Sequence, residues 1–152
     1  MTFEELMDET GALVGIEGFA PDDDGVCVLA SEIGEIAIMQ CKDPVEMVLL
    51  NAPVTEVPAA ADAALLAALE ANRSFKGTNG ATLSVDPETN RFELSQYALL
   101  EDLAPDSLVA MIESFATTLV ALRDKLDAAQ PQAGEDGGAA ELEETLSQFI
   151  RV

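Results

Sequence analysis

The residues of this chain that could do chemistry are mostly carboxylates, because 29 of its 152 residues are Asp or Glu and none is histidine. The lack of histidine excludes Ser-His and Cys-His catalytic pairs and imidazole metal ligands. The run Asp22-Asp23-Asp24-Gly25 could suggest a calcium loop. However, aligning Gly25 with the invariant glycine of an EF-hand puts Ala20 at the first ligand position and Ser31 at the last. We therefore interpret the run as a solvated turn.

The remaining chemical groups match no catalytic pattern either. Cys27 and Cys41 are too few for a zinc site, which needs four ligands. We expect two reduced thiols, with a disulfide between them as the open alternative. The early glycines do not have the spacing of a phosphate-binding loop, and no pair of carboxylates stands out among so many. The sequence predicts no catalytic, cofactor-binding or metal-binding residue, and thus a protein that is not an enzyme.

The charge of the chain restricts its partners. The net charge is -22, which disfavours nucleic acid and anionic membrane surfaces. Residues 1–41 hold ten acidic residues and no basic one. Such a surface suits a basic or neutral, partly unfolded polypeptide, although solubility alone could also explain it. No signal-like N-terminus and no apolar run of about 20 residues is present, so we expect a cytoplasmic protein.

The pattern of apolar residues predicts an α+β domain with a twisted antiparallel sheet of about five strands. A capping box, Thr2-x-x-Glu5, begins the first expected helix. Short apolar runs separated by turn residues predict a meander and then a hairpin. A long last helix is predicted by an apolar stripe at spacings of 4, 3, 4, 3 and 4, which comprises Leu108, Ile112, Phe115, Leu119, Leu122 and Leu126. The expected elements, in the order α-β-β-β-α-β-β-α, are helix 2–14, strands 26–30, 35–40 and 46–52, helix 58–72, strands 81–86 and 91–95, and helix 105–129.

The expected helix over 58–72 is apolar on nearly every side. Pro58 is tolerated in a first turn, and Asn72 is a plausible left-handed cap. A helix that is apolar all round is usually buried all round, so one face should meet the sheet and the other a second partner. Another copy of the chain is the simplest supplier. The alternative is that the alanines make a good solvated helix.

The end of the sequence reads as an addition to the domain at 1–129. Residues 130–138 have the composition of a flexible linker. The spacing of apolar residues over 139–152 predicts a C-terminal amphipathic helix, with Leu142, Leu146, Phe149 and Ile150 on one face. We hypothesise that this helix covers an apolar patch of the domain when no partner is bound.

The stretch 65–126 resembles the class I type III secretion chaperones, the Tir chaperone (CesT) family. The resemblance covers about residues 2–127 and is one of pattern rather than of invariant residues. It is carried by Leu65-Leu66-x-x-Leu69-x-x-Asn72, Phe75, Asn79-Gly80-Ala81-Thr82-Leu83, Phe92-Glu93-Leu94 and Leu103-Ala104-Pro105-Asp106-Ser107-Leu108.

The resemblance implies a non-catalytic cytoplasmic homodimer that uses no cofactor. It would bind the N-terminal segment of a secreted effector and keep that segment extended and competent for secretion. By the resemblance, the effector-binding residues are Phe3, Leu6, Met7, Val26, Val28, Ile36 and Ile38. The dimer interface would comprise Leu65, Leu66, Leu69, Phe92 and Leu94. For each of these residues the alternative is a place in the core of the domain.

Two other interpretations stay open at this point. A non-secretory regulatory module on the same fold would bind a folded partner rather than an export substrate. An acidic mimic that blocks a nucleic-acid-binding protein would rest on charge alone, and its binding would vanish at high salt.

Overall fold

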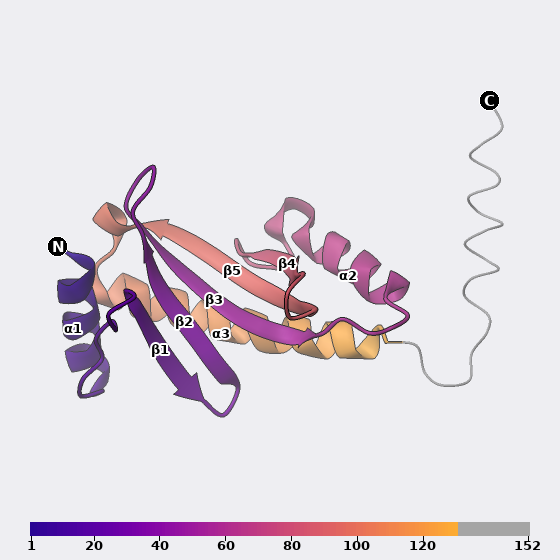
Figure 1. Ribbon diagram of the computed structural model, residues 1–152, viewed down its shortest axis with the longest axis horizontal. Helices are drawn as coiled ribbons and strands as arrows, with labels where there is room; N and C mark the ends of the chain where they lie inside the picture. The colour runs from indigo at the N-terminus through magenta and orange to yellow at the C-terminus, as the bar shows by residue number, and fades with distance from the viewer. Residues whose placement is uncertain (131–152) are drawn as a thin grey trace.

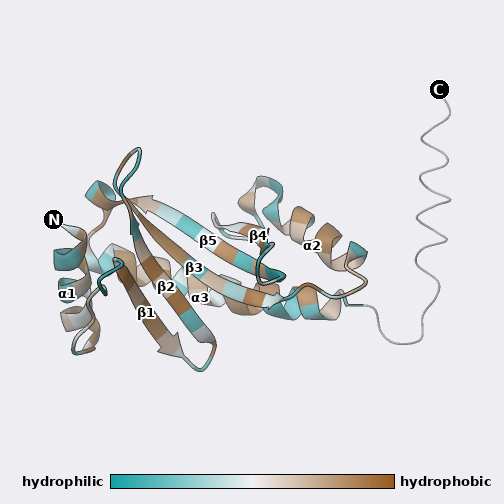
Figure 2. Cartoon of the chain, in the orientation of Figure 1, coloured by the Kyte–Doolittle hydropathy of each residue, from teal (hydrophilic) through white to brown (hydrophobic). Residues whose placement is uncertain are grey.

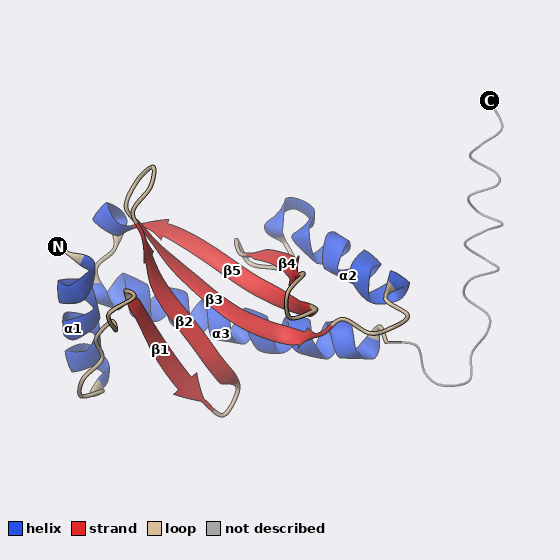
Figure 3. Ribbon diagram, viewed as in Figure 1, coloured by secondary structure: helices blue, strands red, loops and turns tan. Residues whose placement is uncertain are grey.

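The computed structural model describes residues 1–130, and the elements follow the predicted order (Figure 1). All neighbouring strands are antiparallel, in the order β1-β2-β3-β5-β4 (Figure 3). The five-stranded α+β fold is thus confirmed. The expected C-terminal helix, 139–152, and the expected linker, 130–138, apart from its first residue, lie outside the described residues. The elements are α1 (Phe3–Val14), β1 (Val26–Ser31), β2 (Gly34–Cys41), β3 (Met47–Glu56), α2 (Asp62–Asn72), β4 (Thr82–Asp86), β5 (Arg91–Leu99) and α3 (Pro105–Ala128), with 3-10 turns at Arg73–Phe75 and Leu100–Asp102.

The core lies between the sheet and the helices that cover one of its faces (Figure 1). α3 runs along this inner face, α1 packs against α3, and α2 packs against β4 and α3. Every second residue of β2 and β3 points inward, as a strand with one covered face requires. The predicted stripe of α3 is confirmed, because all of its residues are buried except Ile112, which is half-buried. Figure 2 shows apolar residues along much of β1, β2 and β3.

Local signals explain where α1 and α3 begin and how α3 is fixed. The Thr2 hydroxyl accepts the Glu5 N–H at 3.2 Å, and the Glu5 carboxylate accepts the Thr2 N–H at 2.7 Å. The Thr2 backbone N–H, and secondarily the Thr2 hydroxyl, stabilises the Glu5 carboxylate and so lowers the pKa of the Glu5 carboxyl. Pro105 occupies the first turn of α3. Near the other end of α3, the Arg123 guanidinium donates to the Val54 and Ile33 carbonyls, both at 2.9 Å, and so ties the helix to the sheet.

The length and composition of α3 would allow it to cross a bilayer. The core helix of a soluble domain passes the same test, and the apolar stripe of α3 is buried against the sheet. Packing within the domain therefore accounts for the apolar residues of this stripe.

The structure corrects two details of α2. The helix begins at Asp62 and not at Pro58. Asn72 has φ of -69° and is not a left-handed cap; Ser74 and Phe75 are the residues with positive φ. The Asn72 side chain instead bonds to β4, accepting the Leu83 N–H at 2.9 Å and donating to the Leu83 carbonyl at 2.7 Å. It thereby occupies the outer edge of β4 as a neighbouring strand would.

Replacing Asn72 with alanine is expected to lower the free energy of unfolding by about 1–3 kcal/mol. The change leaves both backbone groups of Leu83 without these partners in a half-buried setting. Urea denaturation followed by circular dichroism would measure it. Asn72→Asp keeps the acceptor for the Leu83 N–H but sets a carboxylate oxygen against the Leu83 carbonyl, so it should lower stability as well. Equal stability of all three chains would contradict the bridging role.

Candidate functional site

The outer face of the sheet carries side chains that no part of the described chain covers. The strand register aligns Val26, Met39, Leu49 and Tyr97 in one row across four strands. A second row joins Cys41, Met47 and Leu99, and Val28 pairs with Ala37 beside the first row. Val28 is 53% exposed and Tyr97 is 55% exposed. A contiguous exposed apolar surface of this kind is typical of a protein-binding site.

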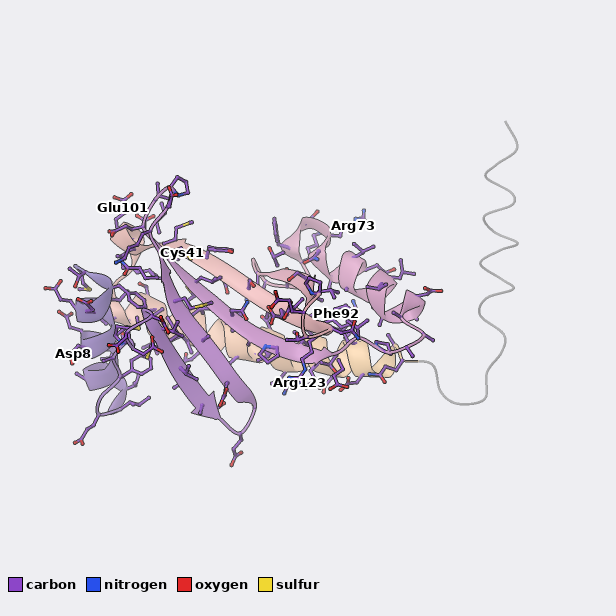
Figure 4. The ribbon with its side chains drawn as sticks, viewed as in Figure 1. Asp8, Cys41, Arg73, Phe92, Glu101 and Arg123 are labelled. Atoms are coloured by element: carbon purple, nitrogen blue, oxygen red, sulfur yellow. The ribbon has the colours of Figure 1, made fainter. Side chains whose placement is uncertain are left out.

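A polar cluster bounds this apolar face on one side. The Asn51 amide donates to Ser95 Oγ at 3.0 Å and to Glu93 Oε2 at 3.3 Å, across β3 and β5. Figure 4 marks Cys41 close to the opposite end of the same face, where β2 leads into the loop before β3. The apolar surface therefore occupies the part of the sheet that β1, β2 and the ends of β3 and β5 form.

The outer edge of β1 offers backbone groups for a further strand. The Gly25 carbonyl accepts the Gln40 N–H, so this residue faces β2. Val26 faces the other way: its N–H donates to Asp22 Oδ1 at 2.9 Å, and its carbonyl accepts the Asp22 N–H at 2.8 Å. Because backbone direction alternates along an antiparallel strand, Val28 and Ala30 also direct their N–H and C=O groups away from β2. Within the described part of the chain no strand pairs with this edge.

A cavity of about 200 Å³ opens on the inner side of this edge. Leu29 contributes to it from β1, and its walls come mainly from α1, the loop after α1, and α3. Thr10 is buried there with its hydroxyl unpartnered. A side chain on a strand added to β1 would alternate between the outer face and this cavity. The lining residues are Thr10, Val14, Ile16, Phe19, Leu29, Val109, Ile112 and Glu113.

Carboxylates flank both ends of the β1 edge. Asp22, Asp23 and Asp24 precede β1 and line a cleft of about 640 Å³ together with Glu4 and Asp8 of α1. Glu32 follows β1 in the β1–β2 turn. Among the described residues, no group of three Cys, Asp or Glu side chains has the geometry to hold a metal ion. The arrangement can therefore attract positive charge toward an edge whose own six residues are uncharged.

A second exposed apolar surface lies at the other end of the molecule, on α2. Four alanines of this helix, Ala64, Ala67, Ala68 and Ala71, face the core, while Leu65, Leu66 and Leu69 point outward. Leu69 is 69% exposed. Phe75 follows with 54% exposure and a φ of +55°, a backbone conformation that costs a bulky residue about 1–2 kcal/mol. An exposed aromatic residue held at such a cost is a reason to examine the surface for function. We call Leu65, Leu66, Leu69 and Phe75 the α2 face.

Comparison with known proteins decides the family. The model of the Tir chaperone protein (CesT) family matches residues 5–123, most of the chain. The chain belongs to this family. It is therefore a type III secretion chaperone by family, as the sequence pattern predicted. No curated protein sequence matches it.

Solved chaperone structures share the fold at low sequence identity. A chain of the HopA1–SchA chaperone–effector complex is 17% identical with a TM-score of 0.66, covering 80% of this chain and 93% of that chain. A chain of the ExsC–ExsE complex is 15% identical with a TM-score of 0.70, covering 81% of this chain and 92% of that chain. For the Yersinia pestis type III secretion chaperone SycH, solved with a fragment of YscM2, they are 15%, 0.59, 80% and 99%.

The structure places most of the predicted effector-binding residues of this chaperone in its core. Phe3, Leu6, Met7, Ile36 and Ile38 are each at most 2% exposed, so they have almost no surface to offer a partner. Their helical and alternating spacing marks the covered faces of α1 and β2, and the contact role does not fit them. Val26 and Val28 point to the outer face, and their role in effector binding stays a prediction.

The predicted dimer residues divide in the same way. Leu65, Leu66 and Leu69 are exposed on α2 and stay candidates for an interface. Phe92 and Leu94 are at most 1% exposed and fill the core on the inner side of β5 (Figure 4 labels Phe92). The resemblance placed these two residues at the interface, but they lie on the side of β5 that the helices cover.

Several residues of the outer face were missed by the sequence reasoning. They are Met39, Cys41, Met47, Leu49, Tyr97 and Leu99. For Met39, Met47 and Leu49 the signal that could have found them is the register, because they are the apolar residues that alternate with core residues in the expected meander. Cys41, Tyr97 and Leu99 lie beyond the expected strands 35–40 and 91–95, which in the structure extend to Cys41 and Leu99. A sheet with apolar residues at both alternations has a second face to bury.

The two thiols are expected to differ in reactivity. Both are free; Cys27 is buried and Cys41 is half-buried. Burial, and secondarily the Asp22 carboxylate, raises the pKa of the Cys27 thiol, which reduces its thiolate fraction. At pH 8 we expect Ellman's reagent to titrate one thiol quickly in the native chain and two after denaturation. Cys41→Ser should remove the fast phase, and a fast phase that remains would contradict this assignment.

Proposed function

We propose that this chain is a cytoplasmic chaperone that binds the N-terminal segment of a secreted effector and keeps it extended for export. The observation that carries the proposal is the open edge of β1, where Val28 and Ala30 present unpaired backbone groups between the apolar outer face and the inner cavity. Such an edge recognises an extended polypeptide through main-chain hydrogen bonds, largely independently of sequence.

The segment would bind as a sixth strand beside β1. Its outward side chains would lie beside those of Val28 and Ala30, because the edge at Val26 is already bonded to Asp22. Its inward side chains would enter the cavity at Leu29, where they would displace any water and bury apolar area. Both the outer face and the cavity favour apolar side chains. We therefore expect apolar residues at most positions of the bound segment, whichever face they point to.

Charge would guide the encounter rather than hold the complex. Asp22, Asp23 and Asp24 lie before β1 and Glu32 lies after it, so basic residues that flank the added strand would be attracted at both ends. This attraction is screened by salt, whereas the apolar contacts are not.

The functional unit that we propose is a homodimer formed through the α2 face. Leu65, Leu66 and Leu69 have no partner within the described chain, although all three are large apolar side chains exposed to solvent. A two-fold interface brings the same surface of both copies together, so the dimer would bury each of these leucines in both copies. The β1 edges lie at the opposite end from α2 and stay open in this arrangement (Figure 1).

Co-expression with a candidate secreted protein from the same genome tests the proposal. We expect a complex of two copies of this chain with one effector, from which limited proteolysis leaves an N-terminal effector segment protected. The mass of the complex is measured by light scattering. A partner that binds only through a folded domain, with its N-terminal segment unprotected, would overturn the proposal in favour of the regulatory module.

A further inference from the structure

Charge is distributed unevenly between the two exposed apolar surfaces of the domain. The first is the surface around the open edge of β1, which we call the β1 surface; β1 and the elements around its edge, α1 and β2, lie within residues 1–41. Residues 1–41 carry ten acidic residues and no basic one. Five of the six basic residues of the described part come after residue 72: Arg73, Lys76, Arg91, Arg123 and Lys125. Figure 4 shows the separation, with Asp8 on α1 at one end and Arg73 beyond α2 at the other.

Two of these basic residues adjoin the α2 face. Arg73 follows Leu69 by four residues, and Lys76 directly follows Phe75; both are exposed. The one ion pair among the described residues joins Arg91 and Glu56, so neither Arg73 nor Lys76 is paired. Asp62 and Glu70 of α2 offset their charge, which makes this surface close to neutral. An acidic segment would therefore meet no net repulsion here, in contrast to the β1 surface.

The chain itself contains an acidic segment with an apolar face. Residues 131–152 hold five acidic residues and one basic residue. Leu142, Leu146 and Phe149, with Ile150, recur at the spacing of one helical face. This apolar face could make contacts with the exposed leucines of the α2 face.

The distance is short enough for a contact within one chain. The C-terminal end of α3 lies close to the chain that leads into α2, because the Thr55 hydroxyl, seven residues before α2, donates to Asp127 Oδ1 at 2.9 Å. α2 has 11 residues, about 16 Å of helix. The nine residues 130–138 span up to about 30 Å when extended, so residues 139–150 can reach any part of the α2 face.

We propose that residues 139–150 bind the α2 face of their own chain and compete there with a second copy. The segment would then oppose dimer formation and leave the β1 edge free. This modifies the hypothesis that the segment covers the effector surface, because the carboxylates around β1 would repel it. The contact itself does not depend on the proposed function, whereas the competition rests on the proposed dimer.

Photocrosslinking of the full chain tests the contact. A benzoylphenylalanine placed at position 149, in place of Phe149, is irradiated at nanomolar concentration, where weak dimers dissociate. We expect an adduct within one chain to the peptide spanning residues 62–76. The same probe at Gln148, off the apolar face, is the matched control and should react several-fold less. Adducts to residues 3–31, or no adduct above the control, would overturn the proposal.

Dimer affinity in the full chain tests the competition separately. Leu142→Asp with Phe149→Asp should strengthen self-association about tenfold, measured by sedimentation. Glu143→Gln with Glu144→Gln, which keeps the apolar face, should change it far less. A crosslink without this gain would retain the contact but overturn the competition. A chain that never dimerises would overturn the proposed dimer, while the crosslink would still decide the contact.

Discussion

Val28→Pro is expected to weaken binding of the effector segment roughly 10–100-fold while the free chain stays folded. The Val28 N–H points away from β2, so the folded domain does not use it, and an edge strand tolerates proline at such a position. In the complex, however, that N–H would donate to the added strand. Its loss leaves a carbonyl of the segment unpaired at a cost of about 1–3 kcal/mol, and every 1.4 kcal/mol is a tenfold change in affinity.

Val85→Pro is the matched control for this prediction. Val85 is also an exposed valine on an edge strand, and it shares the direction of Leu83, whose backbone bonds to Asn72 outside the sheet. Calorimetric titration with the co-purified N-terminal segment would compare both variants with the unchanged chain. Equal weakening by the two prolines, or none by Val28→Pro, would contradict strand addition at β1.

Hydrogen exchange gives the same prediction without a substitution. In the free chain the amides of Val28 and Ala30 should exchange quickly, and those of Cys27 and Leu29 slowly, because only the latter pair with β2. The bound segment should slow Val28 and Ala30 selectively. This pattern separates strand addition from a partner that merely covers the sheet face.

The architecture followed from the sequence because its signals are local and mutually consistent. The Thr2 and Glu5 capping box starts α1, and the stripe from Leu108 to Leu126 fixes the inner side of α3. Each pattern states which residues share a face, and a shared apolar face is sufficient to predict burial. The apolar surplus of α2 likewise predicted a helix with more apolar surface than one neighbour can cover.

The same patterns could not tell a core face from a binding face. Phe3 and Ile38 were expected at the effector surface, yet they are core, because periodicity shows that residues lie together and not which side the rest of the chain covers. The open edge of β1 depends on which residues hydrogen-bond to β2, a non-local fact that one strand's sequence does not contain. Asn72 was predicted to be a cap from its type alone, while its role comes from the approach of Leu83.

Leu69→Asp is expected to convert the proposed dimer into a monomer at low micromolar concentration. Leu69 is 69% exposed in the single chain, so a carboxylate there is solvated and should leave the fold intact. At a two-fold interface the change would remove two buried leucines, each worth about 1.5–3 kcal/mol, and would place two carboxylates in an apolar contact. Affinity between the copies should fall by roughly 100-fold or more.

Leu13→Asp is the matched control, because Leu13 is also a well-exposed helical leucine, 58%, on the outer side of α1. Light scattering should give about twice 16.0 kDa for the unchanged chain and for Leu13→Asp, and a single-chain mass for Leu69→Asp. Loss of the dimer in both variants would point to a general effect of added negative charge on a chain that already carries -22. Persistence of the dimer in Leu69→Asp would show that the interface is not on α2. The row of Val26, Met39 and Tyr97 on the outer face of the sheet would then be the next candidate interface. The β1 edge would have to be tested again in that arrangement.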